Sequence, residues 1–109
     1  MITKIYTDLE QSKKLAEILP LESADMWWDT YEYKPRLEKH YHQYLGETID
    51  PIPCWSLSAL LAQMPCSELV SSQDNKYRVF WKDRFSEWHD NAVDACVELI
   101  ERVRKEEEQ

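Results

Sequence analysis

The chain has 109 residues, enough for one hydrophobic core and too few for two. Its formal net charge of −8 repels phosphate backbones and anionic lipids, so we expect neither nucleic acid nor a membrane as a partner. Hydrophobic residues make up 43% of the sequence, which is sufficient apolar surface to fold and argues against a disordered chain. We therefore expect a single folded domain over residues 1–109.

Two absences in the sequence restrict the class of protein further. The only glycine is Gly46, so a glycine-rich phosphate loop of the P-loop or Rossmann type cannot be built. No window approaches the roughly 20 consecutive apolar residues of a membrane span. The opening residues, MITKIYTDLEQSKK, lack the apolar core of a signal peptide. The sequence thus predicts a cytoplasmic protein.

In chain order, the first predicted element is a helix that begins near Thr7 and ends before Pro20. Thr7 and Glu10 have the spacing of a capping box. Leu15 and Leu19 then recur at helical spacing. A short strand is predicted to follow in the segment ADMWW.

Residues 29–53 form a connection too long for a compact domain, which predicts a variable, aromatic-rich insertion. Pro35 suits the first position of a helix, and Gly46 suits the position just past its end. Together with an apolar face, these residues predict a short helix over 35–45.

The alternative for this segment is an extended pass, in which His40, His42 and Tyr44 share one side. Two histidines on a strand would point the same way, as metal ligands do. A zinc site needs further ligands, and neither His89 nor Cys54 stands at a spacing that would supply them. We expect no metal and no other cofactor.

The segment CWSLSALLAQMP, residues 54–65, combines reactive residue types with an apolar helical face. Its serines lack the Gly-x-Ser-x-Gly elbow of a nucleophile, and Ser56 suits the N-cap of a helix that Pro65 ends. The apolar residues recur at the spacing of one buried helical face, as expected for a structural element rather than a catalytic site. They are Leu57, Leu60, Leu61 and Met64.

The segment KYRVFWK, residues 76–82, is rich in β-branched and aromatic residues and predicts a strand. Its neighbours SELVSS and RFSEWH are short enough to form an antiparallel meander with it. With the predicted strand near Trp27, this makes a sheet of three to four strands.

A long helix is predicted to begin at Asp90 or Asn91. Negative charge at its negative end predicts a frayed acidic tail over 105–109. The fold class is therefore α+β, with a small antiparallel sheet of three to four strands packed against three helices. The apolar face of this last helix consists of Ala92, Val93, Cys96, Leu99, Ile100 and Val103.

Three cysteines, an odd number without a CxxC pair, predict free thiols that are buried as small hydrophobic groups: Cys54, Cys66 and Cys96. Cys54 precedes the second helix, whose dipole is the one feature that would lower a thiol pKa. A thiol hydrolase would have to bring such a cysteine to His89 and Asp90. The acidic residues show no paired spacing, and we expect no enzyme activity.

Aromatic residues crowd into one stretch of the predicted insertion. If their rings are exposed, they form the kind of patch that is enriched at protein interfaces. The alternative is that they pack onto the sheet as part of the core. The candidate partner-binding residues are Trp27, Trp28, Tyr31, Tyr33, Tyr41 and Tyr44.

Three segments carry a resemblance to a known group of proteins: SKKLAEILPLESADM, PCWSLSALLAQMP and the Asp-Ala-Cys helix. In them the chain resembles a family of small proteins, without an assigned activity, from phage-like and other mobile elements of gut bacteria. The resemblance covers about two-thirds of the chain and leaves out the region between Trp27 and Asp50. It implies a mobile-element setting and a bacterial cytoplasm, and it carries over no catalytic residue.

These observations predict a non-catalytic accessory protein of a phage or mobile element that binds another protein through the region from Trp27 to Tyr44. A homodimer through the same aromatic patch is a further prediction. The first alternative is an acidic mimic of nucleic acid that occupies a DNA-binding protein. The second is a small hydrolase or metal enzyme that uses Cys54 or the pair His40 and His42.

Overall fold

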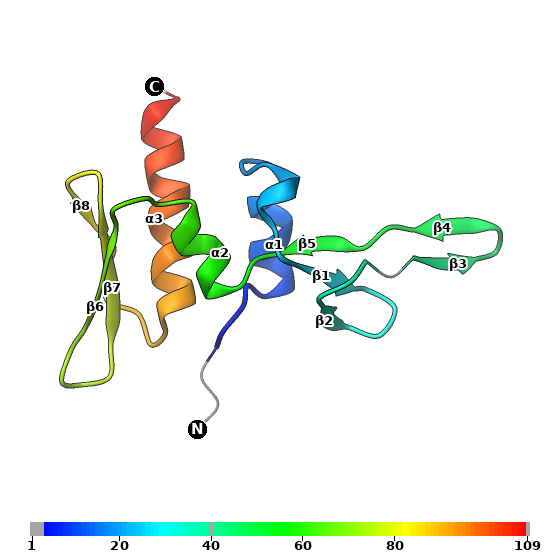
Figure 1. Cartoon of the computed structure of the whole chain (residues 1–109), viewed down its shortest axis with the longest axis horizontal. Helices are drawn as coiled ribbons and strands as arrows, with labels where there is room; N and C mark the ends of the chain where they lie inside the picture. The colour runs from blue at the N-terminus through cyan, green and yellow to red at the C-terminus, as the bar shows by residue number, and fades with distance from the viewer. Residues whose placement is uncertain (1–3, 40, 109) are drawn as a thin grey trace.

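The computed structural model describes residues 4–39 and 41–108, and Figure 1 shows how their helices and strands are arranged. Along the sequence, the elements are α1 (Leu9–Leu15), η1 (Leu21–Ser23), β1 (Met26–Asp29), β2 (Lys34–Arg36), β3 (His42–Tyr44), β4 (Glu47–Ile49), β5 (Ile52–Cys54), α2 (Leu57–Ala62), β6 (Glu68–Ser71), β7 (Tyr77–Trp81), β8 (Arg84–Phe85) and α3 (Ala92–Glu107). This is a small α+β fold with antiparallel sheets.

Two regions can be distinguished, which we call the body and the arm. The body contains α1, α2, α3 and the antiparallel sheet β6-β7-β8. The arm is the segment 26–54, with the antiparallel sheet β2-β1-β5 and the hairpin β3-β4 beyond it. Because of the arm, the radius of gyration is 15.1 Å, whereas a compact chain of this length has about 13 Å.

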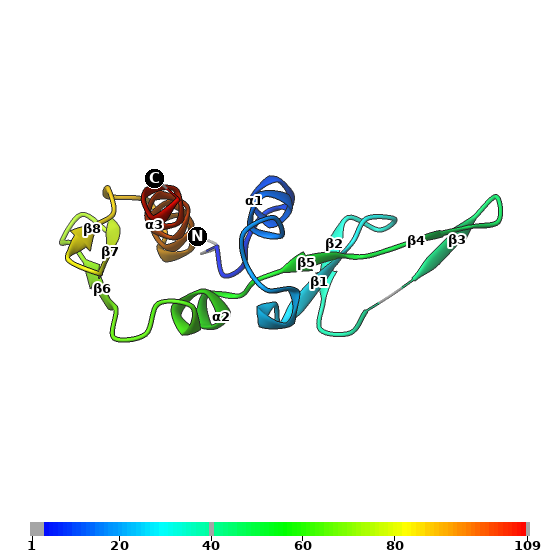
Figure 2. The ribbon, with the colours of Figure 1, turned by 90° about the horizontal axis from the view of Figure 1, so that it is seen from above.

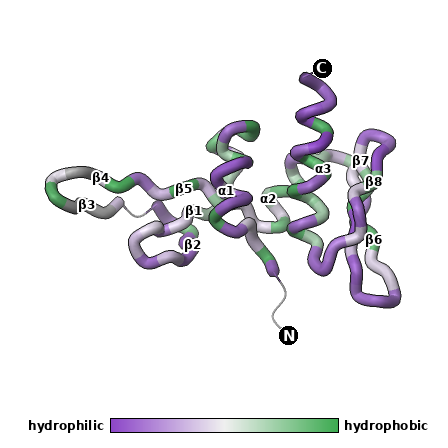
Figure 3. Tube along the Cα trace, turned by 180° about the vertical axis from the view of Figure 1, so that it is seen from behind, coloured by the Kyte–Doolittle hydropathy of each residue, from purple (hydrophilic) through white to green (hydrophobic). Residues whose placement is uncertain are grey.

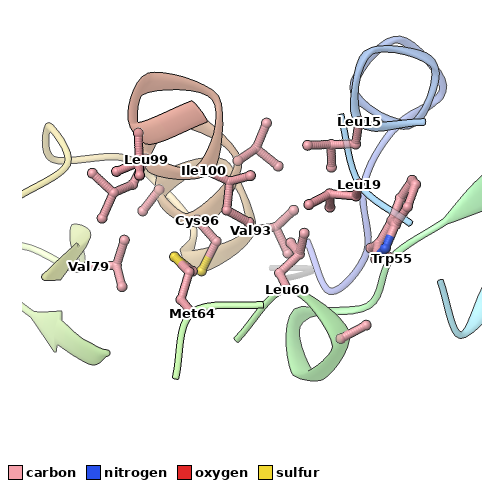
Figure 4. Packing of buried hydrophobic residues seen from close by; sticks show 14 of the residues in the cluster. Leu15, Leu19, Trp55, Leu60, Met64, Val79, Val93, Cys96, Leu99 and Ile100 are labelled. Carbon is pink, nitrogen blue, oxygen red and sulfur yellow. The ribbon is translucent and has the colours of Figure 1, made fainter. Parts of the chain in front are cut away.

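The core lies in the body, where α3 is placed between the β6-β7-β8 sheet and α1 (Figures 1 and 2). Val79 from β7 and Leu99 from α3 are completely buried, as are Leu15, Leu60 and Met64 from the other two helical regions (Figure 4). The apolar faces predicted for the second and third helices are therefore the faces that build the core. Ser56 caps α2 as predicted, since its hydroxyl accepts a hydrogen bond from the amide of Ala59 (3.2 Å).

The first helix begins one residue later than predicted. Asp8 is its N-cap and forms the capping box with Gln11, not Thr7 with Glu10. Thr7 is completely buried, and its hydroxyl bonds the Ser12 hydroxyl at 2.8 Å. Because Thr7 is buried, the exposed Asp8 caps the helix instead.

The helix predicted over 35–45 is wrong, because strands occupy 34–36 and 42–44, and the alternative that His40, His42 and Tyr44 share one side falls outside the described residues. Pro35 lies in β2, and the chain then turns into the hairpin β3-β4. Leu45 and Gly46 both have positive φ, as the two central residues of a tight hairpin turn require. Leu37 and Leu45, which suggested a helical face, are exposed, so the tight turn and strand pairing rather than burial account for the conformation.

The other predicted strands are present, in a different grouping. The meander is β6-β7-β8, while the strand near Trp27 is β1 and belongs to the separate arm sheet. α3 is helical to Glu107, and Figure 3 shows that its last turns are hydrophilic. Fraying of the tail 105–109 stays a prediction, and Gln109 lies outside the described residues.

Candidate functional site

The arm is attached to the body by a junction of buried polar contacts. The amide of Thr7 donates to the carbonyl of Trp55 at 2.9 Å, and the indole of Trp28 donates to the carbonyl of Thr7 at 3.2 Å. The indole of Trp55, which is completely buried, donates to the hydroxyl of Ser23 at 2.9 Å. These bonds tie the N-terminal segment at Thr7 to Trp28 in β1 and to Trp55 directly after β5, and so they fix the base of the arm at both of its ends.

A hollow of about 730 Å³ lies at the base of the arm, between η1, β1, β5 and the segment that leads into β3. Trp27 and Tyr41 contribute its aromatic lining, and Pro51 and Pro53 add apolar surface, with Pro53 paired with Trp27 in the neighbouring strand. We call it the arm groove, and its full lining is Leu21, Glu22, Ala24, Trp27, Lys39, Tyr41, Asp50, Pro51 and Pro53. A concave, mostly apolar lining with a few polar groups is typical of a binding site.

Charged residues of both signs surround the aromatic lining of the groove. The ammonium group of Lys39 lies 5.3 Å from the centroid of the Trp27 ring, within range of a cation–π interaction. Glu22 and Asp50 add two carboxylates to the same lining. The ring face of Trp27 is thus already in contact with a cation, the ammonium group of Lys39.

The turn between β1 and β2 presents two further tyrosines on a rigid frame. The carboxylate of Asp29, which is 1% exposed, accepts hydrogen bonds from the amides of Tyr31 and Glu32, each at 3.1 Å. Arg36 donates to the second oxygen of the same carboxylate at 3.2 Å. Tyr33 has a positive φ of 55°, and its side chain is exposed.

The structure separates the six aromatic residues that the sequence placed in one patch. Trp28 is half-buried at the junction and stands edge-on to Tyr6 at 6.1 Å, outside the hydrophobic core of the body. Trp27 and Tyr41 come together in the arm groove. Tyr31 and Tyr33 lie outside the groove lining, and the side chain of Tyr44 lies outside the described residues.

Prolines close both edges of the arm sheet to strand addition. Trp28 lies opposite Pro35 in β2, and Trp27 lies opposite Pro53 in β5. A proline has no N–H, so these two pairs are the non-bonded pairs of their ladders, and both prolines face the free edges. An incoming strand would therefore find no donor at either position. Sequence reasoning used these prolines only as marks of chain breaks and missed this role.

Two of the three cysteines, Cys54 and Cys96, are buried in surroundings that disfavour the thiolate. Burial raises the pKa of the Cys96 thiol to about 12. Burial also raises the pKa of Cys54, an effect that hydrogen bonds with Thr7 and Ser12 counteract only in part, and this thiol is free and buried as predicted. Cys66 is exposed, contrary to the prediction that all three thiols are buried.

The structure places His89 and Cys54 in different parts of the molecule. His89 contacts Glu98 at 3.2 Å and pairs with Tyr77 in the body sheet, whereas Cys54 lies at the junction. Within the ranges 4–39 and 41–108, no three side chains of His, Cys, Asp or Glu converge as metal ligands would. His40 and the side chain of His42 lie outside the described residues.

Among the described residues, eight acidic side chains are paired with basic ones. In the arm, Arg36 binds Asp29 and Glu32. On the body, the ion pairs are Lys4–Asp94, Lys76–Asp90, Lys82–Glu107, Arg84–Glu106 and Arg102–Glu98. A mimic of nucleic acid needs unpaired carboxylates in a row, and this arrangement does not favour one.

Comparison of the chain with protein-family models, with curated proteins and with solved structures finds no match. In the part of the chain that the structure describes, no helix has the length and apolar character needed to cross a membrane.

Proposed function

We propose that this protein is a non-catalytic protein-binding module and that the arm groove receives a segment of its partner. The observation that carries the proposal is the meeting of Trp27 and Tyr41 with two prolines in one hollow of about 730 Å³. Trp and Tyr provide large contact area at low conformational cost, and they are enriched among the residues that dominate binding energy.

The partner segment is expected to bind through its side chains rather than as an added strand. Pro35 and Pro53 leave the arm sheet without donors on its free edges, so main-chain pairing is blocked there. The net charge of −8, together with Glu22 and Asp50 in the lining, favours a basic segment with an apolar or aromatic anchor. Its cation would replace Lys39 over the Trp27 ring.

The setting in a phage or mobile element of a gut bacterium stays a prediction from the resemblance. The mimic of nucleic acid and the small enzyme stay alternatives as well. The paired carboxylates support the binding module over the mimic, and the raised thiol pKa values support it over a thiol enzyme.

The test compares two tyrosines of the same arm. Both Tyr41 and Tyr33 are more than half exposed, but only Tyr41 lines the groove. A binding protein is first captured from bacterial lysate with the wild-type chain, and its affinity for Tyr41→Ala, Trp27→Ala and Tyr33→Ala is then measured with purified components. Loss of a central aromatic anchor is expected to weaken binding by about tenfold or more.

Tyr33→Ala is the matched control and should bind as the wild type does. Equal affinity for all three variants would remove the arm groove from the proposal. Weaker binding of Tyr33→Ala alone would move the site to the turn between β1 and β2. A loss confined to Trp27→Ala requires a circular dichroism comparison, because Trp27 also lies in the central strand of its sheet.

A further inference from the structure

Strand β6 lies at an edge of the body sheet, and the hydrogen bonds of its neighbour β7 show which way its own backbone points. Tyr77 in β7 exchanges both backbone hydrogen bonds with His89, at 2.7 and 2.8 Å. The carbonyl of Val79 accepts from the amide of Ser86 at 2.9 Å. The backbone polar groups of Tyr77 and Val79 are therefore directed toward the β8 side of β7.

In an antiparallel ladder, two residues that lie opposite each other without bonding to each other direct their backbone N–H and C=O groups to opposite sides. Leu69 lies opposite Val79, and Ser71 lies opposite Tyr77. The N–H and C=O groups of Leu69 and Ser71 thus face outward from the free edge of β6. Within the described chain, no other segment bonds to them.

Of the edges of the two three-stranded sheets, those at β2, β5 and β8 are guarded, whereas the one at β6 is not. Pro35 and Pro53 remove the outward donors of the arm sheet. β8 is two residues long, and the carbonyl of Phe85 accepts a hydrogen bond from Arg102 at 2.8 Å. β6 holds four residues without a proline, and Figure 2 shows it at the margin of its sheet. An open edge of this kind is a template for a further strand.

We propose that β6 pairs antiparallel with β6 of a second copy of this chain, which joins the two body sheets across a two-fold axis. Leu69 then lies opposite Ser71 of the partner subunit, and Val70 lies opposite Val70 of the partner subunit. In this register every outward donor and acceptor of the strand is satisfied.

In this register, the side chains of β6 suit the side chains of the second copy that lie opposite them. Val70 meets a second β-branched residue, a favourable cross-strand pair. Glu68, the single charge of the strand, faces the neutral Ser72 of the partner subunit, so no like charges are opposed. Leu69, which is 41% exposed, gains cover from the added strand.

The contact area of a four-residue strand is small, and each copy carries a net charge of −8. The dimer is therefore weak and concentration-dependent, and salt strengthens it by screening the repulsion between copies. It uses the body and leaves the arm groove free, so it does not depend on the proposed partner binding.

Cysteine cross-linking tests the register directly. In a Cys66→Ser background, Val70→Cys places two thiols at a non-bonded pair with a Cα separation of about 4.5 Å, within reach of a disulfide. Ser71→Cys is the matched control, because its thiols lie two residues out of register, more than about 7 Å apart. Under oxidised glutathione, Val70→Cys is expected to cross-link at least about tenfold faster than Ser71→Cys.

Sedimentation measurements over a concentration series give the second readout. Leu69→Pro removes an outward N–H, as Pro53 does in β5, and is expected to abolish the dimer while circular dichroism stays unchanged. Tyr41→Ala should dimerise as the wild type does. A wild-type chain that is monomeric at all concentrations, or a dimer that survives Leu69→Pro with equal cross-linking of both cysteine variants, would overturn the proposal.

Discussion

In the body, the side chains of Leu60, Met64 and Val79 are completely buried, whereas in the arm Tyr33, Leu37 and Leu45 are 73, 74 and 88% exposed. The body thus holds its shape by removing apolar surface from water. The arm keeps its shape through hairpin turns and through the polar contacts at its base. This division places apolar side chains on a firm support without burying them, which is what a binding surface requires.

The comparison is tested first by removing the same side chain from each region. Leu60→Ala in the body is expected to lower the free energy of unfolding by about 2–5 kcal/mol, because it deletes a completely buried side chain and leaves a cavity. Leu45→Ala in the arm should change it by less than about 0.5 kcal/mol. Urea unfolding followed by circular dichroism gives both values, and similar losses at the two positions would contradict the division.

Within the body, thiol reactivity distinguishes an exposed cysteine from a buried one. Cys66 is exposed, whereas Cys96 is buried and has a pKa of about 12. Because the thiolate is the reacting form, iodoacetamide at pH 8 is expected to label Cys66 at least about a hundredfold faster than Cys96. Mass spectrometry of timed samples gives the rates, with Cys66→Ser as the control that loses the fast phase. Rapid labelling of Cys54 would instead revive the thiol-enzyme alternative.

The conformation of the turn between β1 and β2 depends on hydrogen bonds to the buried carboxylate of Asp29 rather than on buried apolar side chains. Asp29→Ala removes the acceptor for the amides of Tyr31 and Glu32 and for Arg36. A local loss of about 1–3 kcal/mol is expected for the turn between β1 and β2. Hydrogen exchange should show faster exchange at these two amides, with α3 unchanged. Equal acceleration in α3 would mean that the arm and the body unfold as one unit.

The smallest effect is expected from the ion pair that ties the N-terminal segment to α3. Burial alone would raise the pKa of Asp94, but hydrogen bonds from Lys4 and Gln11, both at 2.8 Å, and from Asn91 outweigh it and lower the pKa. A lowered carboxyl pKa contributes stability at pH values above the ordinary value of 3.8. That contribution is lost as the pH falls through the folded-state pKa.

Asp94→Asn is therefore expected to lower stability at pH 7 by less than about 1 kcal/mol, since the pair is partly exposed. The difference from the wild type should shrink as the pH falls below about 4. Thermal unfolding between pH 3 and 7 measures it, and a constant difference over that range would contradict the assignment. Glu10→Gln, an exposed carboxylate in the first turn of α1, serves as the control.

Where the sequence predicted correctly, the signal was local. The apolar face of α2, its cap at Ser56 and the long face of α3 each depend on residues close together in sequence, and the structure confirms them, although α2 ends at Ala62 and the buried Met64 follows it. The start of α1 was displaced by one residue because Thr7 is buried by contacts with a segment nearly 50 residues away. A contact between residues so distant in sequence does not change the spacing of residue types within the helix, so the sequence pattern could not predict it.

The candidate site was predicted in part. The aromatic stretch was found, but the sequence could not show that Trp28 turns into the junction while Trp27 and Tyr41 form a groove. Adjacent residues of a strand point to opposite faces, so their roles depend on what covers each face. The prolines marked chain breaks in the sequence, and their place on the sheet edges emerged only from the register of the strands.

The sequence by itself determined that the chain is an α+β domain with a helical core and an antiparallel meander, because periodicity and caps act within single elements. Only the tertiary structure decided that residues 26–54 extend as an arm, which face of β1 holds the groove, and which sheet edge stays open. These features depend on pairing between strands that are distant in sequence, such as β1 with β5. The free energy of that pairing belongs to the assembled sheet, and no single segment specifies it.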